Sequence, residues 1–271
     1  MVGTEDFGGC PGRRTVLITG GTGGIGQALV ATFVALGDDV VFTYAAEAED
    51  PAAVVRRHPQ NPPTAVRLDL RAAASIESLG ASLTRVPDVV VHNAALGTAT
   101  AARLTSSNHE RDRVLFDVNA VGILALNEVL VPRMVGRGSG TIVLFSSVGG
   151  GIAHYRGFTY ADAMSKAAVA LLGRMLAADL ARTGVDVMTV CPGATRTPMF
   201  EASTLAPMSD DERRAFVEGL PKGRLIEPAE IAELVAFLCT PAARLLHGAV
   251  LDASLGMGVS QGPVSLAVPL P

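Results

Sequence analysis

The sequence is poor in residues that mark disulfide-rich, metal-binding or nucleic-acid-binding proteins. It has only three cysteines in 271 residues, and none of them forms a Cys-x-x-Cys pair. This set argues against a disulfide framework and favours a reducing compartment, so we expect a cytoplasmic protein. The histidines His92, His109 and His247 show no ligand spacing, and we expect no metal. The formal net charge is −4 and no basic cluster occurs, which argues against nucleic acid or an anionic membrane as a partner.

Long apolar runs, tyrosines and lysines are also scarce. No run of about 18 apolar residues is present to span a bilayer, and the first residues lack the apolar core of a secretory signal. We therefore expect no membrane segment, a flexible tail over residues 1–12 and a single domain over residues 13–271. The three tyrosines are Tyr44, Tyr155 and Tyr160, and only Lys166 and Lys222 are lysines. Few side chains can therefore supply a phenol or an ammonium group.

Short apolar runs alternate with longer helical patterns along the chain. The runs cover residues 15–19, 39–43, 65–69, 88–93, 141–146, 185–191 and 248–253. They are nearly continuous in Val, Ile and Leu, which indicates strands buried on both faces of a sheet. The pattern predicts an α/β fold, with a Rossmann-type, doubly wound parallel sheet of about seven strands and helices on both faces. Residues 198–220 interrupt the alternation, and we expect a lid there that brings Met199 and Phe200 to a substrate pocket; the alternative is a surface helix.

A glycine-rich turn follows the first strand, reading TGGTGGIG from Thr19 to Gly26. Glycines at positions 20, 24 and 26 allow a tight turn, close approach of a pyrophosphate to the backbone, and packing of the next helix on the strand. The turn therefore predicts a dinucleotide site, with contacts from Gly20, Thr22, Gly24, Ile25 and Gly26.

The second strand is where the choice between NAD and NADP should be made. An acidic residue at its end would bind the ribose diol of NAD, but Tyr44 stands there, followed by two alanines. The missing acid favours NADPH, although no arginine is present to bind its phosphate, and NADH stays the alternative. Asp69 and Leu70, at the end of the third strand, are expected near the adenine.

These motifs resemble those of the short-chain dehydrogenase/reductase family over residues 14–257. The resemblance implies a cofactor site that includes Asn93 and Ala94 and a nicotinamide site in the segment PGATRT. It also implies a catalytic serine, a helix-bending asparagine that anchors a proton-relay water, and a lysine that binds the nicotinamide ribose. The matching residues are Pro192, Gly193, Thr195 and Thr197 in the nicotinamide segment, then Ser147, Asn119 and Lys166.

The family's tyrosine, four residues before the lysine, is replaced here by Asp162. If Ser147 fixes the alignment instead, Tyr160 takes the tyrosine's place and two extra residues fall within a helix. Loops absorb insertions more easily than helices do, so Asp162 is the better match. Residues 162 and 166 are about 40° apart around a helix, whereas 160 and 166 are about 120° apart. His154 and Tyr155, in the loop before them, are expected to line the substrate pocket.

An aspartate beside an ammonium is a poor proton donor at neutral pH but a good counter-ion for a cation. We therefore expect a reductase that delivers hydride to an imine or iminium carbon of a small natural product. A second interpretation is a ketoreductase of a polyketide-like ketone, with Tyr160, Tyr155 or a substrate phenol as proton source. A third is a dinucleotide-binding regulator without activity. The resemblance also implies a homodimer or homotetramer formed through the long central helices.

Overall fold

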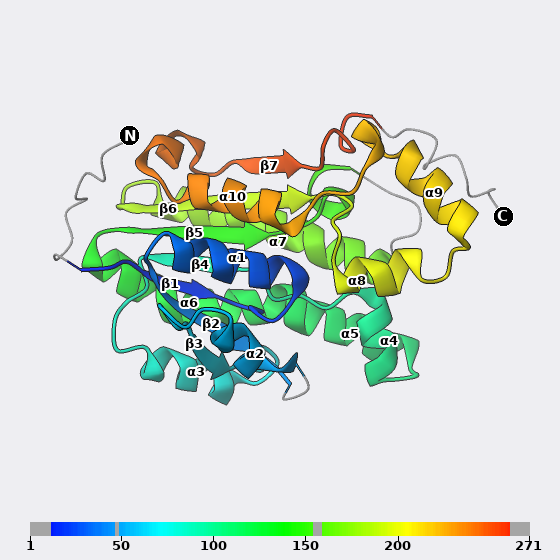
Figure 1. Ribbon diagram of the computed structural model, residues 1–271. Helices are drawn as coiled ribbons and strands as arrows, with labels where there is room; N and C mark the ends of the chain where they lie inside the picture. Colours follow the sequence, from blue (N-terminus) through cyan, green and yellow to red (C-terminus); the bar gives the residue numbers. More distant parts are fainter. Residues whose placement is uncertain (1–11, 47–48, 154–158, 261–271) are drawn as a thin grey trace.

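The computed structural model describes residues 12–46, 49–153 and 159–260. Its centre is a seven-stranded sheet, all parallel, in the order β3-β2-β1-β4-β5-β6-β7 (Figure 1). The strands are β1 (Thr15–Ile18), β2 (Asp39–Tyr44), β3 (Thr64–Arg67), β4 (Val89–His92), β5 (Gly140–Phe145), β6 (Val185–Pro192) and β7 (Val250–Ala253). Every strand lies within two residues of a predicted run. The predicted fold class is confirmed.

Helices cover both faces of the sheet. The α-helices of the described residues are α1 (Gly24–Ala35), α2 (Pro51–Arg56), α3 (Ala73–Ser82), α4 (Thr98–Leu104), α5 (Asn108–Phe116), α6 (Gly122–Arg137), α7 (Tyr160–Leu180), α8 (Pro198–Phe200), α9 (Asp210–Gly219) and α10 (Pro228–Leu238). Helices α1, α2 and α10 contribute to one core cluster, and α3, α6 and α7 to the other.

Alternate residues of each inner strand enter opposite cores. In β4, Val89 and Val91 belong to the cluster under α1 and α10, whereas Val90 belongs to the cluster under α6 and α7. All three are at most 2% exposed. Because both faces of the strand are buried, its sequence reads as a continuous apolar run rather than as an alternation.

A turn of π-helix, η2 (Asp117–Val121), joins α5 to α6 in one continuous helix. By length and composition alone, Asn108–Arg137 could cross a membrane. Its inward residues Ile123, Leu126, Leu130 and Met134 are at most 2% exposed and pack against the sheet. Core helices of sheet proteins pass the same length test, so this helix is weak evidence for a membrane span.

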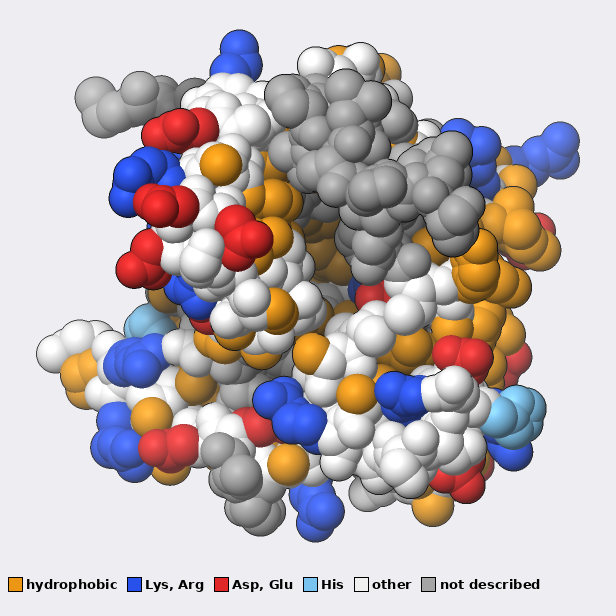
Figure 2. Space-filling view, turned by 90° about the vertical axis from the view of Figure 1, so that its right-hand side faces the viewer, with side chains coloured by type: hydrophobic (Ala, Val, Ile, Leu, Met, Phe, Trp, Pro, Cys, Tyr) orange, Lys and Arg blue, Asp and Glu red, His pale blue; other side chains and the backbone are white. Residues whose placement is uncertain are grey.

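The strands all end at one edge, on the right of Figure 1. The chain order reverses there between β1 and β4, because β1 lies between β2 and β4. Ligands of open parallel sheets bind beyond such a point. Helices α8 and α9 and the turn η4 (Glu201–Leu205) lie beyond the same edge. Figure 2 views this end of the molecule and shows that it is hollowed at the centre.

Candidate active site

The glycine-rich turn between β1 and α1 is fastened to the end of β4. The side-chain amide of Asn93 donates to the carbonyl oxygens of Thr19 (3.1 Å) and Gly20 (3.0 Å). The Thr19 hydroxyl in turn accepts the backbone N–H groups of Asn93 (3.1 Å) and Ala94 (2.9 Å). Gly20 has a φ of +67°, and a Cβ there would lie 2.8 Å from the Ala94 Cα. The two predicted cofactor residues at the end of β4 thus hold the shape of the turn.

The start of α1 is open to an anion. Its N-cap residue, Gly23, provides no side-chain acceptor, and the first turn of the helix contains no acidic residue. A Cβ at Gly26 would lie 2.0 Å from the Gly20 carbonyl oxygen, so glycine is required for the helix to start this close to the turn. First-turn N–H groups without side-chain acceptors, together with the helix dipole, suit a pyrophosphate. The residues present therefore fit the dinucleotide predicted from the sequence, with Thr22 and Ile25 in the same turn.

The residues at the ends of β2 and β3 have different surroundings. Tyr44 closes β2 and is partly buried. The Asp69 carboxylate accepts from the Arg71 guanidinium (2.9 and 2.8 Å), which lowers the pKa of Asp69, and the Arg71 backbone N–H (3.0 Å) adds to this shift. Leu70 is 7% exposed, and a Cβ at Gly122 would lie 2.6 Å from the Leu70 Cβ. Glycine at position 122 therefore lets α6 pack closely against Leu70, and the role of Leu70 in binding adenine stays a prediction.

The segment after β6 reaches back to the glycine-rich turn. Thr195 is buried, and its hydroxyl donates to the Gly193 carbonyl oxygen (3.0 Å). The Thr197 hydroxyl accepts the Phe200 N–H (3.1 Å) and caps α8. A Cβ at Gly24 would lie 2.8 Å from the Thr197 methyl carbon. Two predicted parts of the cofactor site, one after Pro192 and one before α1, are thus in contact.

Helix α7 begins at Tyr160, and the first turn of the helix gives Tyr160 and Asp162 different surroundings. The Thr159 hydroxyl accepts the Asp162 N–H (3.4 Å) as the N-cap. Tyr160 is 84% exposed. Asp162 is half-buried, and its carboxylate accepts the Thr98 hydroxyl (3.1 Å). Asp162, and not Tyr160, is therefore the one held against neighbouring structure, by a residue of α4.

Lys166 lies one helical turn after Asp162. Burial lowers the pKa of its ammonium, and the nearby Asp162 carboxylate opposes that shift. A Cβ at Gly150 would lie 2.9 Å from the Lys166 Cβ, so glycine allows the π-turn η3 (Val148–Ile152) to pack this tightly on α7. This packing brings the loop that begins at Ser147 onto the same helix as Lys166. The Ser147 hydroxyl accepts the Gly149 N–H (3.2 Å).

A buried thiol lies beneath this loop. Cys191 is fully buried, and a Cβ at Gly151 would lie 2.5 Å from its Sγ. Burial raises the pKa of Cys191 to about 11, so the group stays a thiol at neutral pH. The neighbouring Ser146 hydroxyl donates to the Lys166 carbonyl oxygen (2.8 Å). These contacts tie β5, β6 and α7 together beneath the site.

Asn119 is fully buried in η2 and fixes the chain after β4. Its side-chain amide donates to the Leu96 carbonyl oxygen (2.9 Å) and to the Ser165 hydroxyl (3.1 Å), and its oxygen accepts the Leu96 N–H (2.7 Å). The Ser165 hydroxyl donates to the Asp162 carbonyl oxygen (2.8 Å). Asn119 lies within the π-helical turn η2, and its helix-bending role stays a prediction. Its water-holding role stays a prediction.

The predicted substrate residues are only partly described. Met199 is 42% exposed, and a Cβ at Gly97 would lie 3.1 Å from its sulfur. The Phe200 ring is tilted 41° to that of Phe216, with centroids 6.1 Å apart, in a small apolar cluster under α9. Residues 198–220 therefore pack as a helical unit with a core of their own, and their role as a lid stays a prediction. His154 and Tyr155 lie outside the described residues.

Three polar residues near the site had not been singled out from the sequence. Thr98 and Ser165 contact Asp162 and Asn119, and Glu49 contacts the glycine-rich turn. Ser165 directly precedes Lys166 and could have been found from that position. Thr98 and Glu49 lie in segments without a motif, so only the three-dimensional structure identifies them.

Comparison with known proteins agrees with this geometry. The family model described as enoyl-(acyl carrier protein) reductase matches residues 20–258. Oxidoreductase UcpA of Salmonella typhimurium is 31% identical over 241 residues, which cover 87% of this chain and 90% of the relative. The crystal structure of a variant of actinorhodin polyketide ketoreductase with NADPH has a TM-score of 0.82 at 27% identity and covers 92% of this chain and 98% of that one.

A second solved structure also matches most of this chain. The 3-ketoacyl-(acyl-carrier-protein) reductase of Brucella melitensis, complexed with NADH, has a TM-score of 0.78 at 26% identity and covers 91% of this chain and 98% of that one. The residues that the family model matches include the glycine-rich turn from Gly20 onwards, the strand ends from β2 to β7 and the helix that carries Lys166. The chain therefore belongs to the short-chain dehydrogenase/reductase family and is an NAD(P)H-dependent oxidoreductase.

Proposed function

We propose that this oxidoreductase reduces the C=N⁺ bond of an iminium ion, formed from an imine or a hemiaminal of a small natural product. The observation that carries the proposal is the position of Asp162. Its half-buried carboxylate accepts the Thr98 hydroxyl (3.1 Å) and lies one turn before Lys166, whereas Tyr160 is 84% exposed. A carboxylate at this place suits a cationic substrate better than it suits a neutral ketone.

The proton balance supports the same choice. A bound reduced nicotinamide dinucleotide supplies hydride. When an iminium carbon accepts it, a C–H bond forms and the π electrons return to nitrogen, so a neutral amine results without delivery of a proton. A ketone instead becomes an alkoxide and needs an acid of matched pKa. Asp162 would hold the cation, Ser147 would orient it, and Lys166 would bind the nicotinamide ribose.

Ketone reduction is the second candidate, because both solved relatives described above are ketoreductases by name. The exposure of Tyr160 leaves Tyr155 or a phenol of the substrate as its proton source. A regulator without activity is the third candidate, and the joint presence of Ser147, Asn119 and Lys166 weighs against it. A cytoplasmic location stays a prediction from the cysteine content.

We expect the purified protein to oxidise NADH or NADPH in the presence of cyclic imines at a pH where they are protonated, and to leave aromatic ketones nearly unchanged. The loss of nicotinamide absorbance measures both reactions. Because the iminium form is the substrate, the rate with one imine should fall as the pH rises above the pKa of that imine. Faster turnover of ketones than of every imine tested would favour the second candidate, and no turnover of either class would favour the third.

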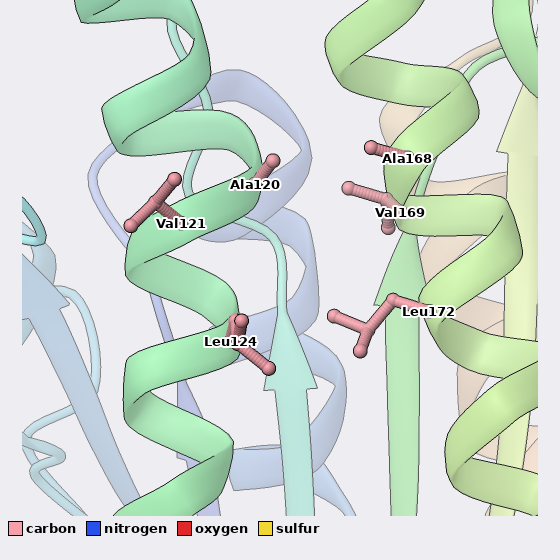
Figure 3. A pocket seen from close by; sticks show the side chains of 6 residues that line it. All are labelled: Ala120, Val121, Leu124, Ala168, Val169 and Leu172. Carbon is pink, nitrogen blue, oxygen red and sulfur yellow. The ribbon is translucent and has the colours of Figure 1, made fainter.

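We further propose that the protein is a homodimer or homotetramer that assembles through α6 and α7. A shallow apolar hollow of about 150 Å³ lies between these helices, away from the glycine-rich turn. In Figure 3, Leu124 and Leu172 face one another across it. Leu171 and Met175, on the outer side of α7, are 60% and 57% exposed. Apolar side chains gathered along two helices are typical of a contact between subunits.

Replacing Leu171 by glutamate should dissociate the oligomer, because the charge would lose its hydration at the helix contact. Light scattering after size-exclusion chromatography measures the mass. Leu36→Glu, at a similarly exposed position (57%) after α1, is the control and should keep the mass of the wild type. An unchanged mass of the Leu171→Glu protein, or a monomeric wild-type protein, would rule out this interface.

A further inference from the structure

A carboxylate closes the gap between the end of β2 and the glycine-rich turn. One oxygen of Glu49 accepts the N–H groups of Ala45 (3.2 Å) and Ala46 (2.9 Å), the two residues that follow β2. Its other oxygen accepts the Thr22 hydroxyl. Glu49 thus bonds to two segments that lie more than twenty residues apart in the sequence, and it does so at the carboxyl edge of the sheet.

This corner is where the adenosine ribose of a dinucleotide is recognised in a doubly wound sheet. With the pyrophosphate at the start of α1, the ribose reaches the end of the second strand, where an acid binds its diol and a cation would bind a 2′-phosphate. Tyr44 occupies the last position of β2, and the two residues that follow it are alanines, so no acid stands directly at the strand end. The chain after β2 instead returns Glu49 to the strand end, five residues later in the sequence.

We propose that Glu49 determines the choice of dinucleotide and favours NADH over NADPH. This inference rests on the dinucleotide binding in the proposed function and reverses the preference expected from Tyr44. The Glu49 oxygen that accepts only the Thr22 hydroxyl can also accept a hydroxyl group of the ribose, while the other oxygen stays bonded to Ala45 and Ala46. A 2′-phosphate at the same corner would meet a negative charge and lose affinity.

The cations around the corner already have partners. Arg57 donates to the Gln27 side chain, Arg56 lies 3.5 Å from Asp50, and the Arg67 guanidinium donates to the Ala45 carbonyl oxygen (3.4 Å). Arg67 is the cation best placed to receive a phosphate, because its contact is the residue next to Tyr44. Neutralising Glu49 should therefore leave a corner that accepts NADPH through Arg67.

Calorimetric titration of the full-length protein with NADH and with NADPH, without substrate, tests this assignment. We expect NADH to bind the wild-type protein about tenfold more tightly or better, and Glu49→Gln to shift the ratio of the two dissociation constants towards NADPH by about tenfold. Glu47→Gln, the same change of charge two residues earlier, is the matched control and should keep the wild-type ratio. Adding Arg67→Met to Glu49→Gln should remove the gain for NADPH.

The possible failures can be told apart. If both dinucleotides bind and the ratio is the same in the wild type and in Glu49→Gln, the inference about Glu49 is wrong while the proposed function stands. A shift caused by Glu47→Gln instead of Glu49→Gln also overturns it. If neither dinucleotide binds the wild-type protein, this inference and the proposed function fail together.

Discussion

Replacing Asp162 by asparagine is expected to lower kcat/KM for a cyclic iminium substrate by about 10²–10³, the effect of removing one preorganised electrostatic group from an active site. Asparagine has the same size and can still accept the Thr98 hydroxyl, which bonds to Asp162 at 3.1 Å. The variant therefore removes the charge and keeps the shape. Initial rates over a range of imine concentrations, at saturating dinucleotide, give kcat and KM separately.

The split between the two constants distinguishes a counter-ion from a structural residue. A counter-ion stabilises the bound cation, so KM should rise, and the affinity for dinucleotide measured by titration should stay unchanged. Asp179→Asn, an exposed aspartate near the end of the same helix, is the control and should behave as the wild type. An Asp162→Asn enzyme within threefold of the wild type would contradict the counter-ion role.

The fold could be predicted because its signals are local and repeated. Runs such as Val89–His92 are apolar at every position, since both faces of each inner strand are buried, and this feature is visible without any tertiary information. The glycine-rich turn could also be predicted from the sequence, because Gly20 and Gly26 occupy positions where a Cβ would collide with the chain. What the sequence shows in these places is backbone geometry.

The site was predictable only where helix geometry decides it. The spacing of Asp162 and Lys166 predicts that they share one face of a helix, and both lie in α7. Contacts between side chains that lie far apart in the sequence could not be predicted. Thr98 contacts Asp162 from the start of α4, and Glu49 contacts Thr22 from the chain after β2. Neither pair is separated in the sequence by a number of residues that would indicate a contact. The proposed preference for NADH rests on such a contact.

Replacing Asp162 by tyrosine should convert the enzyme from iminium to ketone reduction. The new phenol would stand one helical turn before Lys166, whose ammonium favours the phenolate and so lowers the pKa of the phenol towards neutrality. A positioned general acid contributes about 10²–10⁴ to such a rate, and we expect a gain of this order in kcat/KM for an aromatic ketone. Iminium turnover should fall, because the counter-ion is gone.

The gain must depend on the ammonium to support this explanation. Adding Lys166→Met to Asp162→Tyr should abolish ketone turnover, whereas adding Tyr160→Phe should leave it intact, because Tyr160 is 84% exposed at the helix start. Ketone turnover that is already high in the wild type and is lost in Tyr160→Phe alone would mean that the exposed tyrosine moves into the site with substrate. That movement, and not the charge of Asp162, would then determine whether the enzyme reduces a ketone or an iminium ion.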